Sequence, residues 1–109
     1  MEPDECFEAI VTAQREHPGV APPDPSRRGF GSEALTVHGS IFAMVRHGAL
    51  VVKLPAARVS ALIASGDGAS FSAGRGRPMK EWVAVAAVDP AAWQALADEA
   101  REFVGARRA

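Results

Sequence analysis

Apolar residues near the N-terminus recur at the spacing of one helix face. Between residues 4 and 17 this face carries four apolar side chains: Cys6, Phe7, Ile10 and Val11. Their three- and four-residue spacing is typical of an amphipathic helix, and the early acidic residues suit the positive end of the helix dipole. The pattern predicts a helix over residues 4–17, within an N-terminal segment 1–17 that Pro18-Gly19 ends.

Prolines dominate the segment that follows, residues 18–29. Proline has a fixed φ angle and no N–H to donate to a strand ladder. The four in this segment are Pro18, Pro22, Pro23 and Pro25. We therefore expect a stiff connector that cannot donate to a ladder.

After the connector the apolar period changes to two, which is the pattern of strands. Three runs alternate between two faces: residues 35–37, 41–46 and 49–54. Gly39-Ser40 and His47-Gly48 separate these runs and suit two-residue hairpin turns. The pattern predicts a three-stranded antiparallel meander.

The remaining sequence predicts two more helices and one or two more strands. Pro55 suits the first position of a short helix, and Asp89-Pro90 combines a capping carboxylate with a first-turn proline. Gly105 is expected to break the last helix. The expected elements are a helix over 55–65, a brief strand over 70–72, a loop over 73–80, a strand over 81–88, a helix from residue 90 and a frayed tail over 105–109.

These elements follow the order α-β-β-β-α-(β)-β-α, and we predict an α+β fold. Local hairpins favour an antiparallel sheet, made of the three-strand meander plus one or two further strands, with helices packed on one face. The chain has 109 residues, which predicts a single domain over residues 1–109.

Composition limits the size of the core and the class of protein. Hydrophobic residues make up 48% of the chain, but 22 of them are alanines. The core is therefore modest, and both a monomer and a homodimer remain open. No apolar run is long enough to span a membrane, and the acidic start is unlike a secretory signal. We expect a cytoplasmic protein.

Residues with reactive side chains occur in isolated positions. The single cysteine, Cys6, lies on an apolar helix face and is interpreted as part of the core. His17, His38 and His47 have no partner at metal-ligand spacing. No phosphate-binding glycine loop or nucleophile motif is present. We expect no catalytic residues, no metal and no cofactor, because an enzyme would need an active site made of residues interpreted as structural.

Charge is distributed unevenly, although the formal net charge is only −1. Residues 1–25 sum to −5, residues 26–80 to +6 and residues 81–109 to −2. The basic middle block has two interpretations: solvated faces of the sheet and its loops, or a basic face for an anionic partner.

One short motif within this block matches a known DNA-binding segment. The stretch Gly74–Pro78 contains the Arg-Gly-Arg-Pro core of an AT-hook, in which two arginines reach into a narrow minor groove. The usual motif has basic residues on both sides, whereas this one has Ser72-Ala73 before it and only Lys80 after it. A turn between two strands also explains the glycines and the proline. The same arginines could instead hold a phosphate or a protein carboxylate.

Four sequence blocks together resemble one family. They are Arg28–Gly31, Val37–Ala43, Gly48–Leu54 and Pro78–Trp82. From about Arg27 to Val104 the chain is similar to the N-terminal domain of TfoX/Sxy proteins and to the related MmcQ/YjbR-like domains. The resemblance implies a compact α+β fold in a bacterial cytoplasmic protein, a role in assisting a transcription activator or in binding DNA, and no active-site motif.

Within these blocks the polar or aromatic residues are Arg28, Lys53, Lys80 and Trp82. A lysine on an edge strand discourages aggregation between sheets, which is one explanation for Lys53. Trp82 has apolar neighbours on its face and is interpreted as core rather than as a platform for a base.

Two hypotheses follow for function. The leading one is a small non-enzymatic regulatory module that docks on a protein partner. The alternative is a nucleic-acid-binding protein whose basic block contacts phosphates. The candidate contacts with nucleic acid or another anion are Arg27, Arg28, Arg75, Arg77 and Lys80.

Overall fold

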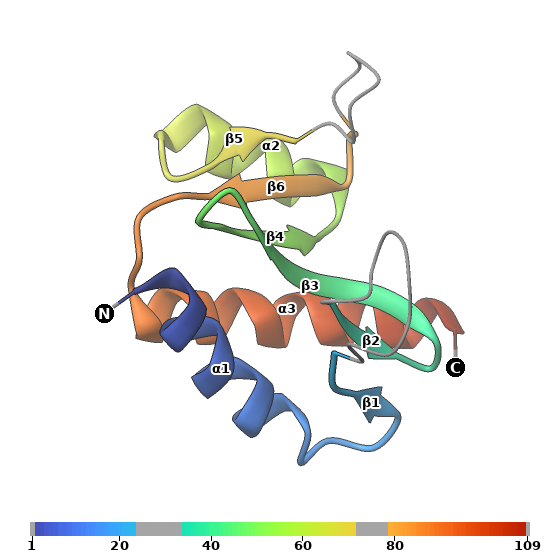
Figure 1. Ribbon diagram of the computed structural model, residues 1–109. Helices are drawn as coiled ribbons and strands as arrows, with labels where there is room; N and C mark the ends of the chain where they lie inside the picture. Colours follow the sequence, from blue (N-terminus) through green and yellow to red (C-terminus); the bar gives the residue numbers. More distant parts are fainter. Residues whose placement is uncertain (1, 24–33, 72–78, 109) are drawn as a thin grey trace.

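The computed structural model describes residues 2–23, 34–71 and 79–108. Three helices and six strands lie in these residues (Figure 1). In chain order they are α1 (Pro3–Gln14), β1 (Val20–Ala21), β2 (Leu35–Val37), β3 (Ser40–Arg46), β4 (Ala49–Lys53), α2 (Ala56–Ser65), β5 (Ala69–Ser70), β6 (Trp82–Val85) and α3 (Pro90–Arg108).

The strands form one antiparallel sheet in the order β1-β2-β3-β4-β6-β5. The predicted α+β class and the meander over β2, β3 and β4 are confirmed. The long helix α3 runs along the sheet with α1 beside it, while α2 lies near β5 and β6 (Figure 1). No helix in the described ranges has the length and apolar character needed to cross a membrane.

The first hairpin turn differs from the prediction by one residue. Val37 pairs with Ser40, so the turn residues are His38 and Gly39 rather than Gly39-Ser40. Both have positive φ angles, 51° and 83°, as the favoured hairpin turn requires. Ser40 therefore begins β3.

The expectation of a connector without ladder pairing is wrong at residues 20–21. Val20 and Ala21 form β1 and pair with Val37 and Thr36. The N–H of Val20 donates to the carbonyl of His17 at 3.3 Å, while the N–H of His38 donates to the carbonyl of Gly19 at 2.9 Å. The segment can therefore pair by accepting hydrogen bonds, and Ala21 is not a proline and keeps its own N–H. Residues 24–29 of the predicted connector lie outside the described residues.

The predicted break at Gly105 is also wrong, because α3 continues to Arg108. A glycine inside a helix costs about 1 kcal/mol relative to alanine, and tertiary contacts offset this cost. Val104 is buried just before the glycine. Arg107 lies beyond it, 5.2 Å from the ring centroid of Phe103, and forms an ion pair with Glu81.

The main core lies on the helix-covered face of the sheet. All three helices contribute to it, including Cys6 and Ile10 from α1, Leu62 from α2 and Trp93 from α3. The indole Nε1 of Trp93 donates a hydrogen bond to the carbonyl oxygen of Ala87 at 2.9 Å. This bond fixes the start of α3 against the end of the sheet.

A second apolar cluster occupies the opposite face of the sheet. Its buried members are Ala34, Met44, Val51 and Trp82, with Ile41, Phe71 and Ala84 packed against them. The central strand β4 therefore buries side chains on both faces: Val51 in this cluster and Val52 in the main core.

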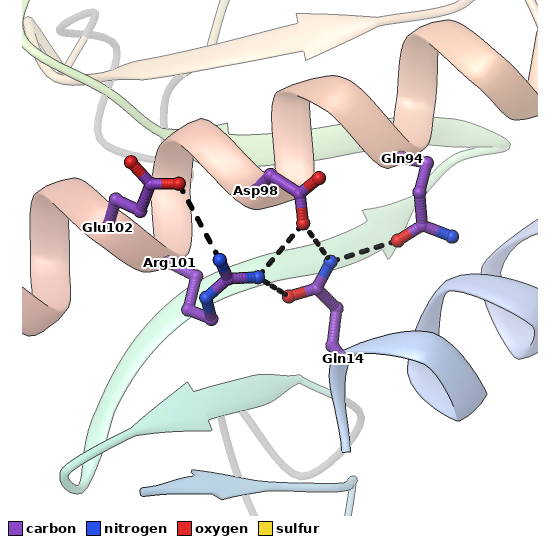
Figure 2. A network of polar contacts seen from close by, with 5 residues as sticks. All are labelled: Gln14, Gln94, Asp98, Arg101 and Glu102. Carbon is purple, nitrogen blue, oxygen red and sulfur yellow. Dashed lines mark hydrogen bonds and ion pairs between the residues drawn. The ribbon is translucent and has the colours of Figure 1, made fainter. Parts of the chain in front are cut away.

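One buried amide connects α1 to α3 (Figure 2). Gln14, only 1% exposed, donates from Nε2 to Gln94 Oε1 at 2.9 Å and to Asp98 Oδ1 at 2.8 Å. Arg101 donates from Nη1 to Gln14 Oε1 at 2.7 Å and to Asp98 at 2.9 Å, and it also pairs with Glu102. The network therefore satisfies both ends of the buried amide.

Replacing Gln14 should destabilise the protein through this network. Gln14→Ala leaves Arg101 and Asp98 in place but removes the amide that joins α1 to them, so we expect a loss of about 1–3 kcal/mol in the free energy of unfolding. Urea denaturation measures this loss. Glu8→Ala, at an exposed position of the same helix, is a control for truncating a long side chain outside the network, and an equal loss in both variants would contradict a role for the network.

The buried thiol should make stability depend on pH. Burial raises the pKa of Cys6 above its ordinary value of 9.0, and the charge of Asp89 raises it further. Above pH 9.0 the thiol of the unfolded chain therefore loses its proton while the folded thiol keeps it, so stability falls as pH rises. The free energy of unfolding, measured by urea denaturation, should therefore fall above pH 9.0 more steeply for the wild type than for Cys6→Ala. If this free energy depends on pH in the same way for both proteins, the raised pKa of Cys6 is contradicted.

Candidate functional site

One of the five predicted anion contacts falls within the described residues. Lys80 lies two residues before the start of β6 and is exposed. The other four are Arg27, Arg28, Arg75 and Arg77, which lie outside the described residues together with the Gly74–Pro78 motif. Lys80 is therefore the one of these five contacts whose surroundings the structure shows.

Pairing of β4 with β6 brings Lys53 to Trp82. The two residues are direct partners in the antiparallel ladder, and the ladder continues with a 2.9 Å hydrogen bond from the N–H of Leu54 to the carbonyl of Glu81. Lys53 Nζ lies 5.9 Å from the centroid of a Trp82 ring, within the range of a cation–π contact. The edge-strand explanation for Lys53 is wrong, because β4 lies between β3 and β6.

A tight turn holds Lys80 beside this pair. The N–H of Trp82 donates to the carbonyl of Met79 at 3.1 Å, and the N–H of Met79 donates to the carbonyl of Phe71 at 2.8 Å. These bonds close a four-residue turn with Lys80 at one of its two central positions. Met79 is 36% exposed, one of the large apolar side chains that remain on the surface.

Together these residues line a shallow depression of about 390 Å³. We call it the lysine surface, and its lining residues are Lys53, Ala56, Met79, Lys80, Glu81 and Trp82. The sequence contains two lysines, and both line this depression. Lys53 is not among the predicted anion contacts, because the proximity of the two lysines depends on a pairing between distant strands.

The lysine surface has an excess of positive charge. Its carboxylate, Glu81, forms a 2.9 Å ion pair with Arg107 of α3. In residues 2–23, 34–71 and 79–108, no carboxylate pairs with Lys53 or Lys80. Lys53 contacts the Trp82 ring in this depression, and the apolar side chain of Met79 lines it beside Lys80.

Trp82 has a structural role beneath this surface. It is buried, and its ring centroid lies 6.5 Å from that of Phe71 in a tilted arrangement. This burial agrees with the interpretation of Trp82 as core and leaves little of the residue to contact a partner.

Other reactive residues remain apart from each other. Cys6 is buried in the main core. His38 and His47 occupy the two hairpin turns, with φ angles of 51° and 53°. The described part of the chain contains no group of three histidine, cysteine or acidic side chains that could hold a metal ion.

Truncating Trp82 should destabilise the fold far more than truncating its exposed neighbour. Trp82→Ala removes a large side chain from the second apolar cluster, and we expect a loss of roughly 3–5 kcal/mol in the free energy of unfolding. Met79→Ala should cost less than about 1 kcal/mol, because more than a third of Met79 is already exposed to solvent. Urea denaturation compares the two, and similar losses would contradict this division between core and surface.

No known protein family, curated protein or solved structure matches the chain.

Proposed function

We propose that this protein is a small non-enzymatic regulatory module that docks an acidic segment of a partner protein on the lysine surface. The observation that carries the proposal is the convergence of Lys53 and Lys80, the two lysines of the sequence, on one depression. Because Glu81 is already paired with Arg107, the charges of the two lysines favour a negatively charged partner.

The apolar side chains of the lysine surface favour a peptide over a small inorganic anion. Met79 lines the depression together with the two lysines, is partly exposed, and adapts its shape readily, as methionines at binding surfaces do. Trp82 lines the same depression. An acidic segment that also carries apolar side chains would match both features.

The resemblance to the TfoX N-terminal domain supports a regulatory role. Of the four polar or aromatic residues in the matching blocks, three line the lysine surface: Lys53, Lys80 and Trp82. The fourth, Arg28, lies outside the described residues. Proteins of this family assist a transcription activator, which would be consistent with docking on another protein.

Nucleic acid is the second candidate partner. Lys53 adds a second cation next to Lys80, and phosphate contacts need such unpaired positive charges. In this alternative the predicted arginines Arg27, Arg28, Arg75 and Arg77 would extend the contact. The affinity for phosphates falls steeply as the salt concentration rises and does not depend on apolar contacts. The affinity for a peptide that also binds through apolar side chains should depend on those contacts, so the two kinds of binding can be distinguished.

The two lysines provide a direct test. Reductive methylation with ¹³C-formaldehyde labels Lys53 and Lys80 while keeping their charge, and NMR then observes both groups. A heptapeptide of alternating glutamate and leucine should shift both signals, and its glutamine counterpart should bind about tenfold more weakly, since two exposed ion pairs contribute about 0.5–1 kcal/mol each. Equal binding of both peptides, or no shift of either signal, would contradict acidic docking.

Variants distinguish the partner classes. Lys53→Gln with Lys80→Gln should abolish the preference for the acidic peptide, whereas Arg15→Gln, at an exposed position at the end of α1, should preserve it. Titration with A·T-rich and G·C-rich duplexes over a salt series tests the alternative. Duplex binding that exceeds peptide binding and falls steeply with salt would favour nucleic acid.

A further inference from the structure

A second cavity lies between α2, α3 and the end of β6, away from the lysine surface. Its volume is about 560 Å³, within the usual range for small-molecule sites. Its apolar floor is formed by Leu62, Val85 and Leu96, all of them buried. We call it the alanine cavity, because its other lining residues include many small ones. These are Gly66, Gly68, Ala69, Ala84, Ala86, Ala87, Ala92 and Ala95.

The cavity exists because two helices pack on different parts of the sheet. α2 contacts β5 and β6, whereas α3 contacts β2, β3 and β4 and packs against α1. Small side chains on the facing surfaces leave the space between them unfilled. Two helix termini line the cavity. Gly66 ends α2 with a φ angle of 84°, and Asp89 caps α3 by accepting hydrogen bonds from the N–H groups of Ala91 and Ala92.

An ion pair joins the two helices across this space. Arg58 of α2 donates from Nε to Glu99 Oε1 at 2.9 Å and from Nη2 to Glu99 Oε2 at 3.2 Å. Both residues line the cavity, and their side chains are 43% and 39% exposed. A surface ion pair of this exposure contributes little to stability, so a ligand could displace it at small cost.

The charges that line the cavity sum to a negative value. Asp67, Asp89 and Glu99 face a single cation, Arg58. The hydrogen bond with Glu99 and the nearby charge of Asp67 raise the pKa of Arg58, which reflects its position among carboxylates. A ligand carboxylate that approached Arg58 would therefore meet these negative charges, whereas a ligand cation would be attracted to them.

We propose that the alanine cavity binds a small organic cation, with its apolar body on Leu62, Val85 and Leu96 and its ammonium group at Glu99. The inference goes beyond the proposed docking function and does not depend on the lysine surface. It commits to a small molecule because three elements line the cavity and its volume suits a single ligand.

A titration with three ring compounds of similar shape tests the charge and the position of the ligand. The probes are cyclohexylammonium, cyclohexanol and cyclohexanecarboxylate, followed by ¹H–¹⁵N NMR. The ammonium should shift the amides of Gly66, Gly68 and Ala87, which line the cavity, and bind about tenfold more tightly than the carboxylate. Equal affinity for both ions, or shifts confined to residues outside the cavity, would overturn the proposal.

Matched variants test the site itself. Ala95→Leu places a larger side chain in the cavity and should weaken ammonium binding at least about tenfold. Ala9→Leu, at an exposed position of α1, should leave binding unchanged. Glu99→Gln should reduce the preference for the cation, whereas Glu102→Gln on the same helix should preserve it. Unchanged binding by folded Ala95→Leu would overturn the proposal.

Discussion

The antiparallel pairing of β4 with β6 determines how the rest of this structure is arranged. It joins the predicted meander to the C-terminal half of the chain, and it makes β4 a central strand with buried side chains on both faces. Because side chains alternate along a strand, the same register that buries Val51 and Val52 also sets Lys53 on the same face of the sheet as Trp82. The core and the lysine surface are therefore consequences of one pairing, and a slip of one residue would disrupt both.

The helices use this sheet in different ways, and the difference creates the second cavity. α1 and α3 share the centre of the sheet and are joined by the buried amide of Gln14. α2 packs at the edge formed by β5 and β6 and reaches α3 through the exposed pair Arg58–Glu99. The central core is filled by large apolar side chains. Between α2 and α3 the facing residues are mostly alanine and glycine, which are too small to fill the space, and the alanine cavity remains.

Local patterns in the sequence predicted most of the fold. The helix stripes and the hairpin turn at His47-Gly48 depend on residues close in the chain, and these predictions are confirmed, while the first turn differs by one residue. Contacts between distant segments were not predictable in this way. One example is β1, which forms between prolines because it pairs with β2. Another is α3, which continues beyond Gly105 where Arg107 packs on the ring of Phe103. The candidate site shows the same division between local and long-range features. The charge pattern of the sequence predicted Lys80 as an anion contact, whereas Lys53 joins the site only through the pairing of β4 with β6.

The most direct measurement of the central pairing is the proximity of the Lys53 side chain to the indole ring of Trp82. Nuclear Overhauser effects should connect the ε-methylene protons of Lys53 with ring protons of Trp82, and the ring current should move the lysine signals upfield, since Nζ lies 5.9 Å from the ring centroid. Lysine signals at their ordinary positions, with no such connection to Trp82, would contradict the register of β4 and β6 and the surface that depends on it.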